Sequence, residues 1–174
     1  DVLKRIMTAY EKGTDYHIGM DSDCLIQAGA DLEQLTWMDV RVGDYLPTPR
    51  HGKPVEINAY WYNDLKIMEQ FALLQQDSKL AQYYAELADK VKEAFLLKFW
   101  NEEENCLKDV LSGNEEENQV RCNQVWALSM PYTMLPNEKE LCVLHKIKEE
   151  LYTTAGLRTL SPKDSAFHDI YIGS

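Results

Sequence analysis

Two residue types that build metal centres and disulfides are scarce in this chain and scattered along it. The four cysteines share no CxxC spacing and the four histidines form no close pair; these residues are Cys24, Cys106, Cys122, Cys142, His17, His51, His145 and His168. Zinc sites take ligands from closely spaced pairs, so we expect no metal site and no cofactor. Isolated thiols are typical of a reducing compartment, and the expected location is therefore the cytoplasm.

Positive charge and long apolar runs are missing as well. The chain has 18 Lys and Arg against 29 Asp and Glu, a net charge of −11. Binding to a nucleic-acid backbone relies on clustered Lys and Arg, so nucleic acid is not expected as a partner. The sequence contains no signal peptide and no apolar run of about 18 residues, so a membrane is not expected either. The hydrophobic content of 45% is instead typical of a globular chain with a real core.

What the chain does have is a stretch rich in aromatic, acidic and amide side chains, at residues 35–65. It reads LTWMDVRVGDYLPTPRHGKPVEINAYWYNDL. Trp37 stands two residues before Asp39, and Arg50 precedes a predicted helix start that carries Glu56. Sugar faces stack on indole rings, sugar hydroxyls need hydrogen-bond partners, and glycosidic cleavage needs a proton donor. The stretch therefore indicates a sugar-binding cleft.

Apolar periodicity predicts helices of two kinds. Residues 55–76 and 123–135 are apolar nearly all round, and we expect both helices to be buried on most sides. Pro131 should kink the second of these helices or end it early. Residues 78–100 and 138–152 are apolar on one face only, which is typical of an outer layer.

A further helix is predicted to end at Lys12, before Gly13, and short strand pieces are expected within residues 15–34 and 106–113. The pattern does not support a parallel α/β sheet. Inner helices alternating with outer ones, joined by long loops, predict an all-α fold of the helical-toroid type, with inner and outer helices paired as hairpins.

Three blocks of the sequence resemble the glucosidase part of glycogen-debranching enzymes, the amylo-α-1,6-glucosidase family, in its bacterial or archaeal form. They are TWMDVRVGDYLPTPRHGKPVEINAYWYN at 36–63, RCNQVWALSMPY at 121–132 and GLRTLSPKDSAFHDIYIGS at 156–174. The first block is the most specific of the three. Cys122 stands where the family usually has proline, which changes a backbone restraint rather than a polar group.

The resemblance implies an (α/α)6 toroid that removes the α-1,6-linked glucose left at a glycogen branch point, with inversion at the anomeric carbon. Such a toroid needs six helix pairs, whereas about two and a half are predicted here. We therefore expect residues 1–174 to be a single central fragment of a larger glucosidase domain, without an internal domain boundary. The expected partner is glycogen or another branched α-glucan.

Asp39 is the candidate general acid. Inverting glycosidases place an acid and a base about 6.5–9.5 Å apart, and the ring of Trp37 would exclude water from the Asp39 carboxyl, favouring the protonated form that a donor needs. The alternatives are an aspartate that caps a turn or one that pairs with Arg41. The resemblance implies that the second carboxylate comes from further toward the C-terminus, so we expect the 174 residues alone to be inactive.

The candidate substrate contacts are aromatic, charged and amide side chains in the first two blocks. They are Trp37, Arg50, Glu56, Asn58, Trp61, Asn123 and Gln124. Each has a structural alternative: core packing for the tryptophans, and a helix-dipole charge or a brace to Arg50 for Glu56. Of Asn58 and Asn63, five residues apart on one helix, only one is expected to reach a cleft.

Two other functions stay open at this point: a helical glucan-binding module without catalysis, and another toroidal glycosidase of the glucoamylase or trehalase type. A fragment would also leave apolar helix faces uncovered, such as that of residues 55–74, and we expect such faces to be covered by self-association.

Overall fold

The computed structural model describes residues 1–30, 32–33, 35–38, 40–113 and 115–170, with residues 115 and 116 described for their backbone only. The α-helices are α1 (Val2–Lys12), α2 (Val55–Leu74), α3 (Ser78–Phe99), α4 (Trp126–Ser129) and α5 (Asn137–Glu150). The 3-10 helices are η1 (Glu115–Asn118) and η2 (Cys122–Val125). The strands are β1 (Gly19–Met20), β2 (Ile26–Gln27), β3 (Lys53–Pro54), β4 (Trp100–Asn101), β5 (Cys106–Leu107), β6 (Val110–Leu111), β7 (Tyr152–Thr153) and β8 (Gly156–Leu157).

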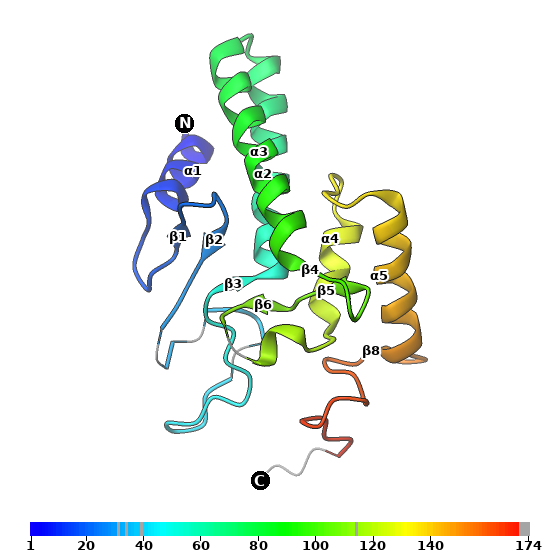
Figure 1. Cartoon of the computed structure of the whole chain (residues 1–174). Helices are drawn as coiled ribbons and strands as arrows, with labels where there is room; N and C mark the ends of the chain where they lie inside the picture. Colours follow the sequence, from blue (N-terminus) through cyan, green and yellow to red (C-terminus); the bar gives the residue numbers. More distant parts are fainter. Residues whose placement is uncertain (31, 34, 39, 114, 171–174) are drawn as a thin grey trace.

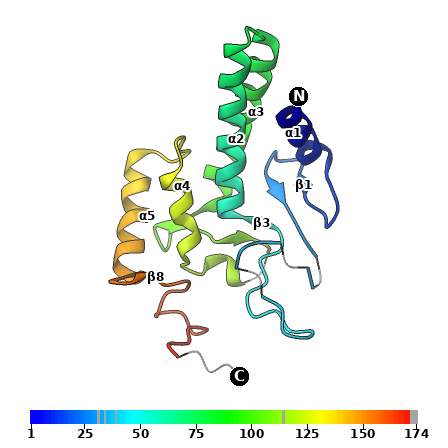
Figure 2. The same ribbon diagram turned by 180° about the vertical axis from the view of Figure 1, so that it is seen from behind.

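The long hairpin of α2 and α3 forms the centre of the molecule, with α1 on one side of it and α4 and α5 on the other (Figures 1 and 2). Pro54 stands just before α2, where its lack of an N–H group costs nothing because that donor would have no partner inside the helix. Asp77 caps α3, and its side chain accepts a hydrogen bond from the Leu80 backbone N–H at 3.2 Å. The sequence predicted both helix starts, and the structure confirms them.

The outer-layer character predicted for α3 is also confirmed, because this helix buries one face only. Its buried side chains recur at helical spacing and are Ala81, Tyr84, Leu87, Ala88, Val91, Phe95 and Phe99. Phe95 and Phe99 stack with their ring centroids 4.5 Å apart. Both rings are fully buried, so at about 25 cal/mol per Å² of buried apolar surface they contribute strongly to the core.

The burial predicted for α2 holds for most of the helix but not for its end. Its N-terminal two thirds is buried on most sides, whereas Phe71, Leu73 and Leu74 are 42%, 51% and 80% exposed. This end of the hairpin projects beyond α4 and α5 in both views (Figures 1 and 2). This end of α2 is exposed because α4 and α5 lie beside only the lower part of the helix.

The helix predicted over residues 123–135 ends before Pro131, which is one of the two outcomes expected from that proline. The chain forms η2 and then α4, which ends at Ser129, and Met130 is extended with φ −75° and ψ 154°. Steric contact between a proline ring and the residue before it disfavours the helical region, so Pro131 ends the helix early. The helix predicted over 138–152 is confirmed as α5, within two residues at either end.

The strands pair antiparallel in four two-stranded ladders, β1–β2, β3–β6, β4–β5 and β7–β8. Gly52, at φ +106°, pairs with Ala28 just before β3, and a Cβ atom there would lie 2.2 Å from the Leu111 carbonyl oxygen. Only glycine tolerates both the dihedral angle and the close approach. This contact fixes the loop that carries Arg50 against β6.

Mostly helical structure is thus confirmed for the described residues, and the (α/α)6 toroid itself stays a prediction. The loop at 40–52, the segments at 108–113 and 115–121, and residues 158–170 gather at one end of the helices (Figure 1). Among the described residues, none of the helices combines the length and the apolar character that crossing a bilayer requires.

Candidate functional site

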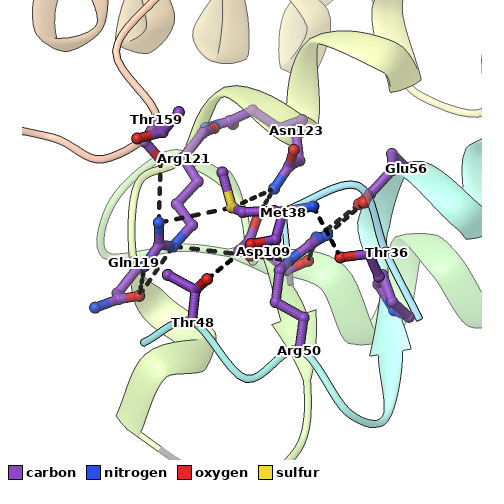
Figure 3. Close-up of polar contacts among 12 residues, drawn as sticks. Thr36, Met38, Thr48, Arg50, Glu56, Asp109, Gln119, Arg121, Asn123 and Thr159 are labelled. Atoms are coloured by element: carbon purple, nitrogen blue, oxygen red, sulfur yellow. Dashed lines mark hydrogen bonds and ion pairs between the residues drawn. The ribbon is translucent and has the colours of Figure 1, made fainter. Parts of the chain in front are cut away.

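A buried cluster of charged side chains lies where these loops meet the start of α2. Arg50 donates from Nη2 to Glu56 Oε2 at 2.6 Å and from Nη1 to Glu56 Oε1. It also donates from Nε to Asp109 Oδ2 at 2.7 Å and from Nη2 to the Asp109 carbonyl at 3.1 Å. The three residues are only 2%, 1% and 3% exposed. Figure 3 shows the guanidinium held between the two carboxylates.

Charge compensation decides the ionisation of this cluster. Burial acts to lower the pKa of Arg50, but the hydrogen bonds to Glu56 and the charge of Asp109 outweigh it, and the pKa is raised. The guanidinium is therefore permanently charged. The cluster accounts for the brace between Arg50 and Glu56 that the sequence left open as an alternative.

A second arginine lies on the far side of Asp109. Arg121 donates to Gln119 Oε1 at 3.0 and 2.8 Å and to the Thr159 carbonyl at 3.2 Å, while its Nε lies 4.0 Å from Asp109 Oδ2. Burial lowers the pKa of Arg121, and the charge of Asp109 does not offset this effect. The contacts tie the tail after β8 to the segment before η2 (Figure 3).

Asn123 connects the charged cluster to Trp37. Its Nδ2 donates to Asp109 Oδ1 at 2.8 Å, and its Oδ1 accepts from Trp37 Nε1 at 2.9 Å. The sulfur of Met38 lies 3.6 Å from the same Nδ2 and 3.7 Å from Nη1 of Arg121, so it packs between the two polar groups (Figure 3). One continuous series of contacts therefore runs from the buried cluster to an indole at the surface.

That indole borders an open pocket of about 530 Å³. Trp37 is 62% exposed and Trp126 is 41% exposed, and Tyr60 meets Trp126 edge-on with ring centroids 5.6 Å apart. Glu56 also lines the pocket; the remaining lining residues are Leu35, Thr36, Ile57, Cys122, Val125 and Leu157. Three aromatic rings surround a mostly apolar hollow, the kind of surface on which flat apolar faces of ligands stack.

A second cavity of about 520 Å³ lies beside the same cluster. Arg50, Asp109 and Arg121 line it together with Tyr45 and His168. Since Arg50 lines this cavity and Glu56 lines the aromatic pocket, their ion pair lies between the two. The cavity is more polar, because two guanidinium groups and a carboxylate border it.

Comparison with known protein families shows which family this chain belongs to. A family model described as amylo-alpha-1,6-glucosidase matches residues 1–174. The chain belongs to the amylo-alpha-1,6-glucosidase family. None of the curated proteins compared with the chain matches it.

The structure brings together four of the site residues predicted for this member of the glucosidase family: Trp37, Arg50, Glu56 and Asn123. Trp37 and Glu56 border the aromatic pocket, and Arg50 borders the polar cavity. Asp39, the candidate acid, lies outside the described residues.

Three other predicted residues hold the backbone in place and line neither pocket. Asn58 accepts from the Ile26 N–H at 2.8 Å and donates to the Ile26 and Pro54 carbonyls, both at 3.0 Å. Trp61 is 3% exposed and donates from Nε1 to the Cys24 carbonyl. These two side chains fix the β1–β2 region against α2.

Gln124, the third of these residues, also holds backbone groups in place. It accepts from the Leu107 N–H at 3.2 Å and donates to the Arg121 carbonyl at 3.1 Å. With these atoms in use and the side chain 1% exposed, Gln124 fixes η2 against β5. Direct glucan contacts by Asn58, Trp61 and Gln124 stay predictions.

Asp109 is the residue that sequence reasoning missed. It lies between two acidic runs, where a carboxylate is most simply solvated, but it also lies between Leu107 and Val110, both 1% exposed. An acidic residue inside a short apolar run was the available signal, because a buried carboxylate needs a cationic partner. The described residues contain no group of three or more His, Cys, Asp or Glu side chains placed to hold a metal ion.

Proposed function

We propose that this glucosidase-family chain binds the non-reducing glucose of a branched α-glucan in the aromatic pocket and takes part in cleaving its α-1,6 bond. One observation carries the proposal: Trp37, Tyr60 and Trp126 form an open aromatic pocket beside a rigid charged cluster. Sugar rings stack on such surfaces, and polar groups at the rim bind their hydroxyls.

The proposed reaction is inverting hydrolysis with Asp39 as general acid. Asp39 follows Trp37 by two residues, so the segment that carries it begins at the wall of the pocket. Protonation of the glycosidic oxygen would accompany attack by a water that a second carboxylate activates from the opposite face of the sugar. Glu56 is poorly suited to be that base, because both of its oxygens accept hydrogen bonds from Arg50.

Release of glucose from a phosphorylase limit dextrin by the full-length protein tests the activity, and proton NMR of the first product tests the stereochemistry. We expect β-glucose first, since inversion of an α linkage gives the β anomer. Asp39→Asn should abolish turnover while leaving glucan binding intact. Asp44→Asn is the matched control on the same loop, because Asp44 pairs with Arg41 at the surface, at 3.4 Å. Unchanged turnover in the Asp39 variant excludes it as the acid.

A binding module without catalysis is the second candidate. The exposure of Trp37 and Trp126 favours it, because stacking platforms bind glucan whether or not a carboxylate is near. Glucan binding without any glucose release would establish this candidate. A profile that prefers α-1,4 or α,α-1,1 linkages would instead indicate a glucoamylase-like or trehalase-like enzyme.

Three further proposals concern the chain as a whole. We expect the 174 residues alone to be inactive in the limit-dextrin assay, and we expect a cytoplasmic location, which cell fractionation tests. The apolar residues exposed on α1 and α2, among them Val2, Leu3 and Leu74, are expected to drive self-association of the isolated chain, which size-exclusion chromatography tests.

A further inference from the structure

We propose that Asn123 is a positioning residue, oriented by Asp109, that fixes the Trp37 indole as the stacking wall of the aromatic pocket. The inference rests on the proposed function, because it assigns Asn123 a part in glucan binding by Trp37. Asn123 is fully buried and does not line the pocket, so it acts on the ligand only through Trp37.

Trp37 depends on this hydrogen bond because packing restrains only part of its ring. The residue is 62% exposed, whereas Trp61 is 3% exposed and is held by the core on all sides. The bond from Trp37 Nε1 to Asn123 Oδ1, at 2.9 Å, ties the exposed ring to a group that cannot move. A ring fixed in this way meets the sugar already oriented, and binding then costs less conformational entropy.

The direction of every hydrogen bond in the series is determined. A carboxylate only accepts, so Asp109 requires the NH₂ end of the Asn123 amide, at 2.8 Å. The carbonyl end of the amide is thereby turned toward Trp37, whose indole N–H only donates. The Asp109 carboxylate is itself held in place, because its second oxygen accepts a hydrogen bond from Arg50 Nε at 2.7 Å.

This fixed order of donors and acceptors makes a sharp test possible with two isosteric substitutions. Asn123→Asp removes the donor and sets a carboxylate against Asp109. Asp109→Asn sets two NH₂ groups against each other, so the Asn123 amide must turn and present a donor to the Trp37 N–H. The double variant restores the order, because the amide introduced at position 109 would accept from Arg50 and donate to the carboxylate introduced at position 123. That carboxylate would in turn accept from Trp37.

The kinetic readout is the KM for limit dextrin, measured in the intact protein. Each single substitution should raise KM about two- to tenfold, the effect of one broken hydrogen bond, while kcat stays close to the wild-type value. The double variant should return KM toward that of the wild type. Asn101→Asp is the matched control, because Asn101 bonds to Asn118 outside both pockets and its variant should leave KM unchanged.

A second readout needs no substrate. In protein labelled with 5-fluorotryptophan, the ¹⁹F resonance of Trp37 is the one that disappears in Trp37→Phe. That resonance should shift in each single variant and return in the double variant. Trp37→Phe also guards against misfolding of the buried variants: it removes the N–H donor at an exposed position, and Asn123→Asp should add nothing to its KM.

Unchanged KM or an unchanged Trp37 resonance in the single variants would overturn the inference. A double variant in which neither KM nor the Trp37 resonance returns toward the wild-type value would overturn it as well. Additive effects of Trp37→Phe and Asn123→Asp on KM would overturn it too. If the wild-type protein releases no glucose and binds no glucan, the proposed function fails instead, while the ¹⁹F experiment still reports whether Asn123 positions Trp37.

Discussion

Removal of the Arg50 guanidinium tests the charged cluster most directly. Arg50→Met keeps much of the apolar stem but deletes four hydrogen bonds, three to carboxylate oxygens and one to a carbonyl. Glu56 would then be buried without a cation, and Asp109 would keep only the more distant guanidinium of Arg121, whose Nε lies 4.0 Å from Asp109 Oδ2. Breaking a buried pair in this way costs about 3–5 kcal/mol, which corresponds to a Tm lower by about 6–20 °C for a chain of this size.

Urea denaturation of wild type and variant at pH 7 measures this loss in the free energy of unfolding. Arg41→Met is the matched control, because Arg41 faces solvent and pairs with Asp44, whose side chain is 91% exposed; its change should stay below about 1 kcal/mol. Arg50→Met/Glu56→Gln should recover part of the stability by removing one orphaned charge. A loss for Arg50→Met no larger than that of Arg41→Met would refute the reasoning.

Three further predictions concern other parts of the fold. Burial acts to raise the pKa of Glu150, but hydrogen bonds from Ser161, Lys146 and Lys163 outweigh this effect and lower the pKa below 4.5. Glu150→Gln should therefore reduce the free energy of unfolding at pH 7, with the difference from wild type shrinking as pH falls below that value, whereas Glu149→Gln at the surface should show little effect. Asp77→Ala removes the acceptor for the Leu80 N–H and should cost about 1 kcal/mol in urea denaturation. Burial raises the pKa of the Cys106 thiol to about 12, so mass spectrometry should find Cys106 unmodified by maleimide at pH 8 until urea unfolds the chain.

The helices were predictable because their signals are local. Pro54 before α2, Asp77 before α3 and the one-sided apolar pattern of α3 all act within a few residues of the element they shape. Over 123–135 the apolar pattern continues past Pro131 while the helical backbone does not, and the early end expected from that proline is confirmed. Periodicity reports which residues are buried, and a proline decides where the helix ends.

The candidate site was only partly predictable, because its contacts join distant segments. The spacing of Arg50 and Glu56 allowed a brace, and the structure has it. The apolar neighbours of Asp109 indicate a buried carboxylate, but nothing near it in the sequence identifies its partner, because Arg50 lies 59 residues away. Asn58 is of a residue type expected in a sugar-binding cleft. Buried backbone groups also need such amides, however, and they bond to both the oxygen and the nitrogen of the Asn58 side chain.

The bond between Trp37 and Asn123 joins residues 86 positions apart, and that separation bears on the order in which the protein assembles. During synthesis, the aromatic pocket cannot form until η2 has left the ribosome, although α2 and α3 are complete well before. Closing so long a loop costs conformational entropy before any contact stabilises it, so contacts between residues this far apart in the sequence form slowly. Arg50 and Glu56 are available to each other before Asp109 leaves the ribosome, and Asn123 follows later still, so the nascent chain presents a helical hairpin first and the aromatic pocket last.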